Sequence, residues 1–163
     1  MSKARQLADL GDDFDGTNLT LSGGVYLGGT GSANKLDDYE VGRFDPSMTA
    51  TSVTYNNRQG DYVKIGKLVN IYIFVEWSAI SGWSGNISGL PFTQSSLDTF
   101  YPMGQVFNNE GVSYPSGRST VLAYANDNTS IMSVATVGSA INGAAPIPSS
   151  SGYMHISLTY QTS

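Results

Sequence analysis

Two short segments contain the residue types of metal-binding or phosphate-binding loops. Asp13-Phe14-Asp15-Gly16 has the carboxylates and the turn glycine of part of a calcium loop. In that frame the first and twelfth ligand positions fall on Gly11 and Ser22, so both charged ends are missing. Gly28–Lys35 has the glycine content of a phosphate loop, but Asn34-Lys35-Leu36 stands where Gly-Lys-Ser/Thr is required. We therefore expect no metal ion and no cofactor.

The sequence does not show a set of residues for acid–base or nucleophilic catalysis. The single histidine, His155, has no sequence-localised serine and aspartate with which to form a catalytic triad. Glycoside hydrolysis requires two carboxylates that flank the scissile bond. The acids available in the distal part of the chain are Glu76, Asp98, Glu110 and Asp127, and no spacing selects a pair among them. The sequence thus favours a binding or structural protein over an enzyme.

Three aromatic residues in predicted loops are candidate ligand contacts. Trp83 lies within Gly82-Trp83-Ser84-Gly85, and Tyr101 and Tyr114 lie in other turn-rich segments. An aromatic ring flanked by small polar residues can stack on the apolar face of a sugar. For Trp83 the alternative, which we prefer, is that the ring folds back and packs against the domain or a neighbour.

The elements that would carry these residues are strands. From about residue 45 apolar and polar residues alternate, and this period of two predicts strands. Residues 67–78 form the clearest one, with a single face made of Val69, Ile71, Ile73, Val75 and Trp77. Leu68, Tyr72 and Phe74 lie on the opposite face, so we expect one face in the core and the other in a subunit interface.

Other strands are predicted on both sides of this one. Residues 51–55 and 61–65 flank a predicted hairpin loop over 56–60, where Asn and Gly tolerate positive φ. Further strands are expected near 86–90, 100–107, 119–124, 130–137 and 153–160. In the last, we expect Met154, Ile156, Leu158 and Tyr160 to point one way and His155 the other. Many short strands with intervening turns predict an all-β fold, an antiparallel jelly-roll-like sandwich.

The charges are distributed unevenly. The net charge is −5, and after Lys67 the only formal charges are Glu76, Asp98, Glu110, Arg118 and Asp127. The negative net charge argues against a nucleic-acid role, because phosphate binding requires clustered Lys and Arg. The scarcity of charges in the β domain favours oligomerisation. The chain has no cysteine and no apolar run of membrane-spanning length, so we expect no disulfide and no membrane insertion.

We divide the chain into three parts. Residues 1–22 form an N-terminal arm, in which Ser2–Leu10 is predicted to be a short helix with Ser2 as N-cap and Gly11 as stop. Residues 23–44 are a glycine-rich junction, and residues 45–163 are the β domain.

Four segments follow one another along the chain: Ser2–Ala8, Leu27–Gly31 with Ala33–Glu40, Tyr62–Gly66 and Ile87–Phe92. Together they resemble segments of fibre and spike proteins of tailed bacteriophages. The junction, Leu27–Gly31 followed by Ala33–Glu40, resembles the sequence between the virion-attachment segment and the terminal β domain of such proteins. Ser2–Ala8 resembles the start of marine-phage fibre proteins, and Tyr62–Gly66 and Ile87–Phe92 resemble recurrent fibre motifs. The resemblance ends near Phe92. Within it, Phe44 stands where relatives usually carry Trp.

The resemblance implies a homotrimeric protein of the virion, assembled in the host cytoplasm. Its N-terminal arm would contact other virion proteins, with Lys3, Arg5, Leu7 and Leu10 as candidate anchors. Its β domain would face outward and bind a host-surface glycan or protein. Two alternatives remain open: a head or tail decoration protein with a purely structural role, and, less favoured, a polysaccharide depolymerase.

Overall fold

The computed structural model describes residues 24–36, 38–96, 101–107, 111–138 and 145–162. The chain divides into two compact units, Met1–Tyr39 and Glu40–Ser163. The predicted N-terminal helix, the anchor residues Lys3, Arg5, Leu7 and Leu10, and the calcium-like segment 13–16 lie outside the described residues.

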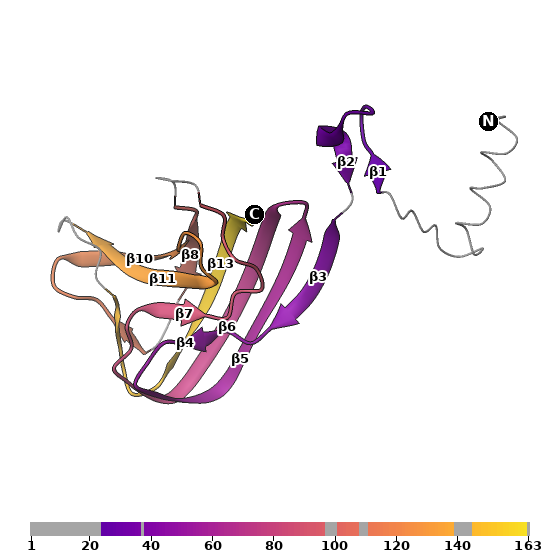
Figure 1. Ribbon diagram of the computed structural model, residues 1–163. Coiled ribbons are helices and arrows are strands. Elements are labelled where there is room, and N and C mark those ends of the chain that lie inside the picture. Colours follow the sequence, from indigo (N-terminus) through magenta and orange to yellow (C-terminus); the bar gives the residue numbers. More distant parts are fainter. Residues whose placement is uncertain (1–23, 37, 97–100, 108–110, 139–144, 163) are drawn as a thin grey trace, which may run out of the picture. The chain divides into compact units, whose positions relative to one another are not determined.

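The described part of the first unit is a small hairpin built from the glycine-rich junction. Strand β1 (Val25–Tyr26) pairs antiparallel with β2 (Lys35–Leu36), and a 3-10 turn, η1 (Ser32–Asn34), lies between them (Figure 1). The amide of Leu27 donates to the carbonyl of Asn34 over 2.8 Å. Gly28 has a φ of 92°, which favours glycine. The junction is therefore a folded hairpin over this range.

The second unit contains the large sheet. Its strands are β3 (Tyr39–Phe44), β4 (Ser47–Met48), β5 (Ser52–Ile65), β6 (Leu68–Ser81), β7 (Asn86–Ser88), β8 (Met103–Phe107), β10 (Arg118–Ala125), β11 (Ile131–Gly138) and β13 (Gly152–Gln161). Within the described residues they form one nine-stranded sheet in the order β3-β5-β6-β13-β8-β10-β11-β7-β4. Strands β9 (Val112–Ser113) and β12 (Ile147–Pro148) form a separate pair.

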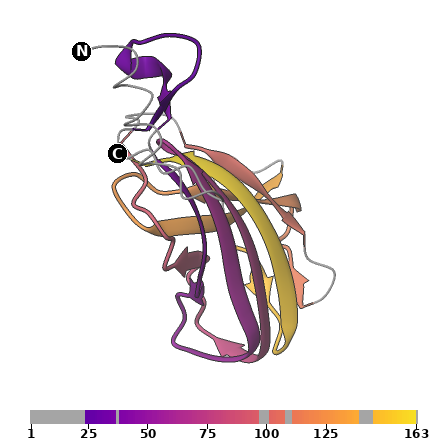
Figure 2. The ribbon, with the colours of Figure 1, turned by 90° about the vertical axis from the view of Figure 1, so that its right-hand side faces the viewer.

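The sheet curls strongly. Its two edge strands, β3 and β4, follow one another in sequence with only Asp45 and Pro46 between them. A link this short joins opposite edges only if the sheet rolls up, and both ribbon views show the half with β4, β7, β10 and β11 lying across from the half with β5, β6 and β13 (Figures 1 and 2). The amide of Met48 donates to the Tyr55 hydroxyl over 2.6 Å and ties β4 to β5.

The core lies between these two halves. Val69, Ile71, Ile73, Val75 and Trp77 of β6 are all 0% exposed, which confirms the face predicted for this strand. The predicted face of β13 is also buried and consists of Met154, Ile156, Leu158 and Tyr160. Strands β10, β11, β7 and β4 close the core from the other half. Their main contributors are Ala123, Ala125, Met132, Val134, Ile87 and Met48.

One local prediction is wrong. Residues 56–60 are not a hairpin loop, because they lie inside the 14-residue strand β5, which pairs with β6 along its length. Register shifts at Thr54/Tyr55 and Tyr55/Asn57 absorb the irregular residues there. The actual β5–β6 turn lies at Gly66-Lys67, between the paired residues Ile65 and Leu68, and Gly66 has a φ of 56°.

The all-β prediction is confirmed, and every sheet pairing with a defined register is antiparallel. The predicted sandwich is realised as one curled sheet whose two halves face each other, in place of two separate sheets. Strand β3, Tyr39–Phe44, which lies within the range 23–44 that we assigned to the junction, is an edge strand of the large sheet.

Candidate interaction surface

The face of β6 opposite the core is open to solvent in the single chain. Tyr72 is 51% and Leu68 is 48% exposed, while Phe74 is half-buried. Paired residues of antiparallel strands share a face, so β13 adds Ser157 opposite Tyr72 and His155 opposite Phe74. This outer face continues across β13 onto β8.

Five aromatic rings cluster on the outer face; we call Tyr72, Phe74, Phe107, Tyr153 and His155 the aromatic face. His155 is central, because it pairs in register with Phe74 on β6 and with Phe107 on β8. The centroid of the imidazole lies 4.7 Å from that of Phe74, 5.8 Å from Tyr153, 6.1 Å from Tyr72 and 6.2 Å from Phe107. The Tyr72 hydroxyl and His155 Nδ1 are 3.3 Å apart.

On β8 the outer face carries the most exposed apolar side chains of that strand. Alternate residues of β8 share the outer face, and Met103 is 71% and Phe107 is 62% exposed. Tyr101 precedes this strand and is 51% exposed, with its ring packed edge-on against Tyr124 at 5.6 Å. The β8 side of the outer face therefore presents protruding apolar groups.

On the β5 side the outer face is hollowed. A shallow cavity of about 120 Å³ is lined by Asp61, Tyr62, Val63, Asn70 and Tyr72, and its lining is mostly apolar. Asn70 Nδ2 donates to Thr159 Oγ1 over 2.8 Å and thereby connects the hollow to β13. The hollow and the β8 protrusions thus lie on opposite sides of the aromatic face.

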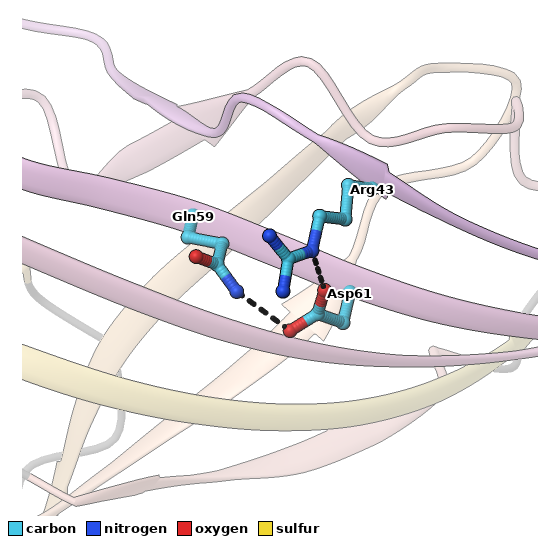
Figure 3. Close-up of polar contacts among 3 residues, drawn as sticks. All are labelled: Arg43, Gln59 and Asp61. Atoms are coloured by element: carbon cyan, nitrogen blue, oxygen red, sulfur yellow. Dashed lines mark hydrogen bonds and ion pairs between the residues drawn. The ribbon is translucent and has the colours of Figure 1, made fainter.

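The one carboxylate of the hollow is neutralised locally. Arg43 Nε of β3 lies 3.0 Å from Asp61 Oδ1, and Gln59 Nε2 donates to Asp61 Oδ2 over 2.9 Å (Figure 3). Two neighbouring strands therefore hold this carboxylate through both oxygens. Nearby, the Tyr62 hydroxyl donates to Glu40, and this hydrogen bond to the carboxylate raises the pKa of Tyr62.

The three predicted ligand contacts differ in exposure. Trp83 is only 9% exposed, belongs to the core cluster, and donates from Nε1 to the carbonyl of Asn86 over 2.9 Å. Its position matches the packing alternative. Tyr101 is 51% and Tyr114 is 39% exposed, so their rings face solvent. The three residues come from separate segments of the chain.

No catalytic constellation forms among the described candidates. The groups around His155 are aromatic rings and a tyrosine hydroxyl. Asp127 accepts a hydrogen bond from Gln94, Glu76 lies on β6, and Asp98 and Glu110 are outside the described residues. Within the part of the chain that the structure describes, no group of three metal-ligating side chains occurs, and no helix is long and apolar enough to cross a membrane.

Only part of the aromatic face follows from the sequence. Strand periodicity predicts Tyr72 and Phe74 on a candidate subunit interface and His155 on the outer side of the last strand, but it does not place them beside Phe107 or the hollow. The sequence pattern that could have identified this face is the placement of aromatic residues at outward positions of three predicted strands, at 72 and 74, at 153 and 155, and at 107. Their proximity depends on β13 lying between β6 and β8.

Comparisons with known proteins found a likeness of fold. No protein-family model matches the chain, and no curated protein matches it. Among solved structures, the fold is similar to that of the Dettilon tailspike protein (gp208), with a TM-score of 0.59 and 19% identity. The match covers 76% of this chain and 24% of that one, so the chain spans about a quarter of the length of its structural relative.

Proposed function

We propose that this chain is a virion protein of a tailed bacteriophage, of the fibre or spike type, whose β domain binds a host-surface glycan. The observation that carries the proposal is the fold likeness to a phage tailspike over 76% of the chain. The sequence motifs of the junction and of residues 62–66 and 87–92 point independently to the same class of protein.

The two ends of the chain have different roles. The N-terminal arm attaches to the virion, three copies assemble, and the curled sheet is displayed outward. Tyr101 and Tyr114 are the glycan contacts, because their rings are exposed and a sugar ring stacks on an aromatic surface. The proposed activity is non-covalent binding without chemistry on the glycan.

Virions that lack the protein provide the test. Loss of adsorption to host cells with intact particles supports the attachment function. Normal adsorption with fragile particles contradicts it and indicates a decoration protein. Shortening of purified host polysaccharide by the isolated chain contradicts the absence of catalysis. Electron microscopy of virions that carry a tagged copy then places the protein on head or tail.

A further inference from the structure

The outer face of the β domain exposes apolar surface at the upper end of what a free monomer shows. Apart from Tyr101, which we propose as a glycan contact, its exposed apolar residues are Val63, Ile65, Leu68, Tyr72, Met103 and Phe107, with exposed fractions between 39% and 71%. At roughly 100 Å² each, about half of the area of a large side chain, they present on the order of 600 Å². Patches of this size mark interaction sites, and a standard interface buries about 800 Å² per partner.

The two sides of this face are complementary in shape. Met103 and Phe107 protrude on the β8 side, and the hollow lined by Val63, Asn70 and Tyr72 opens on the β5 side. Its volume of about 120 Å³ is on the scale of one aromatic ring, because a dry cavity of ~150 Å³ holds benzene. The hollow is lined by residues of β5 and β6, and β13 separates it from β8, so a Phe107 ring that enters the hollow has to come from another molecule.

The electrostatics favour a second copy of the same chain. Asp61, the carboxylate in the hollow, is paired with Arg43. Another acidic residue of the outer face, Glu76, lies opposite Tyr153, four residues along β6 from Tyr72. The hollow and Phe107 therefore meet without like-charge repulsion. A glycan requires many hydrogen-bonding groups along its length, whereas the six exposed residues are largely aliphatic and aromatic. A surface with so few charges also offers few charged groups by which a different protein could be selected electrostatically.

We infer that copies of this chain associate head to tail through the outer face, with Phe107 of one copy seated in the hollow of the next. Such a contact joins two different surface regions and is heterologous, so it generates a closed ring when the rotation between copies closes. This inference rests on the proposed function only for the number of copies, three; the surface itself follows from the exposed residues and the hollow.

The test uses three single substitutions in the full chain. Phe107→Arg blocks the protruding side, Val63→Arg blocks the hollow, and Ile147→Arg adds the same charge at an apolar residue that is 54% exposed on β12. By sedimentation at micromolar concentration, the wild type and Ile147→Arg are expected as multimers. The two outer-face variants are expected to sediment as monomers and to keep the circular dichroism spectrum of the wild type. Their dissociation constant for self-association is expected to rise at least ~10-fold.

Mixing the two blocked variants tests the head-to-tail geometry. The Phe107→Arg chain keeps an intact hollow and the Val63→Arg chain keeps an intact Phe107, so an equimolar mixture is expected to form a dimer. A mixture that stays monomeric overturns the head-to-tail contact. A multimer that survives both substitutions overturns the outer face as the interface and leaves the proposed trimer standing. A monomeric wild type overturns both self-association claims, and glycan binding by that monomer would still be measurable separately.

Discussion

The ring of Phe44, at the end of β3, lies directly over Gly60 in β5. A Cβ placed on Gly60 would be 2.3 Å from Phe44 Cζ and 2.4 Å from Cε1, closer than real Cβ contacts come. Phe44 also packs near Tyr62, with ring centroids 6.4 Å apart. The edge strand is therefore anchored by an aromatic ring that uses the space left by a missing side chain.

Gly60→Ala is expected to lower the free energy of unfolding by about 1–3 kcal/mol, because the added methyl group displaces a ring within a packed layer. Urea denaturation followed by tryptophan fluorescence measures the change. Gly31→Ala, whose Cβ would meet Asn34 Nδ2 at an ordinary 3.8 Å in the separate hairpin, is the control and leaves the transition unchanged. In the Phe44→Leu background the cost of Gly60→Ala should shrink, and equal costs in both backgrounds would show that the ring is not the cause.

The same glycine shows why the sequence predicted the strands better than their connections. The alternating apolar residues of β6 and β13 report burial directly, and both strands were assigned with the correct inner face. Asn56–Gly60 has turn composition, but its conformation is decided by pairing with β6 and by the Phe44 ring, which are non-local. Local propensity therefore pointed to a loop, and tertiary contacts imposed a strand.

Trp83→Ala is expected to destabilise the β domain by about 3–5 kcal/mol, because it empties a core position and leaves the Asn86 carbonyl without its indole donor. Tyr101→Ala should cost no more than about 1.5 kcal/mol, the value of an aromatic pair, since the ring is half exposed. Urea denaturation of both variants gives these values.

Glycan binding separates the roles of the same two residues. Titration of host polysaccharide should show weakened binding for folded Tyr101→Ala and unchanged binding for Trp83→Phe, which keeps most of the core volume. Loss of binding in Trp83→Phe together with full binding in Tyr101→Ala would contradict the choice of exposed rings as glycan contacts.

The Arg43–Asp61 ion pair is expected to contribute little to stability. The two side chains are 75% and 48% exposed, and exposed pairs contribute between about 0 and 1 kcal/mol because solvent and salt screen them. Arg43→Gln, made in the Phe107→Arg chain so that the hollow stays uncovered, should therefore shift the urea midpoint only slightly, and the shift should decrease further at high salt. A loss well above 2 kcal/mol that persists in salt would show that the pair is shielded from solvent within the single chain.

How far the interaction surface could be predicted also depends on non-local structure. The outward positions of Tyr72 and His155 follow from strand periodicity alone. Their contact does not, because β6 and β13 are separated by more than 60 residues of chain and become neighbours only through the sheet order. The burial of Trp83 has the same origin: its glycine- and serine-rich surroundings predict a turn, and the curl of the sheet decides that the ring points inward.

The ionisation of Tyr160 is expected to lower the stability of the β domain at alkaline pH, and one substitution tests this. The ring is 1% exposed, its hydroxyl donates to the Phe92 carbonyl over 3.0 Å, and burial raises the pKa of Tyr160 to about 12 from 10.0. Because the folded state holds this proton more tightly than the unfolded state, the stabilisation is complete below pH 10 and decreases as pH rises from about 10 to 12. Two pKa units correspond to at most about 2–3 kcal/mol.

Tyr160→Phe removes this titration, so the difference in unfolding free energy between wild type and variant should narrow over that pH range. Urea denaturation at pH 8, 10 and 11 measures it, and a difference that stays constant would show that Tyr160 titrates alike in both states.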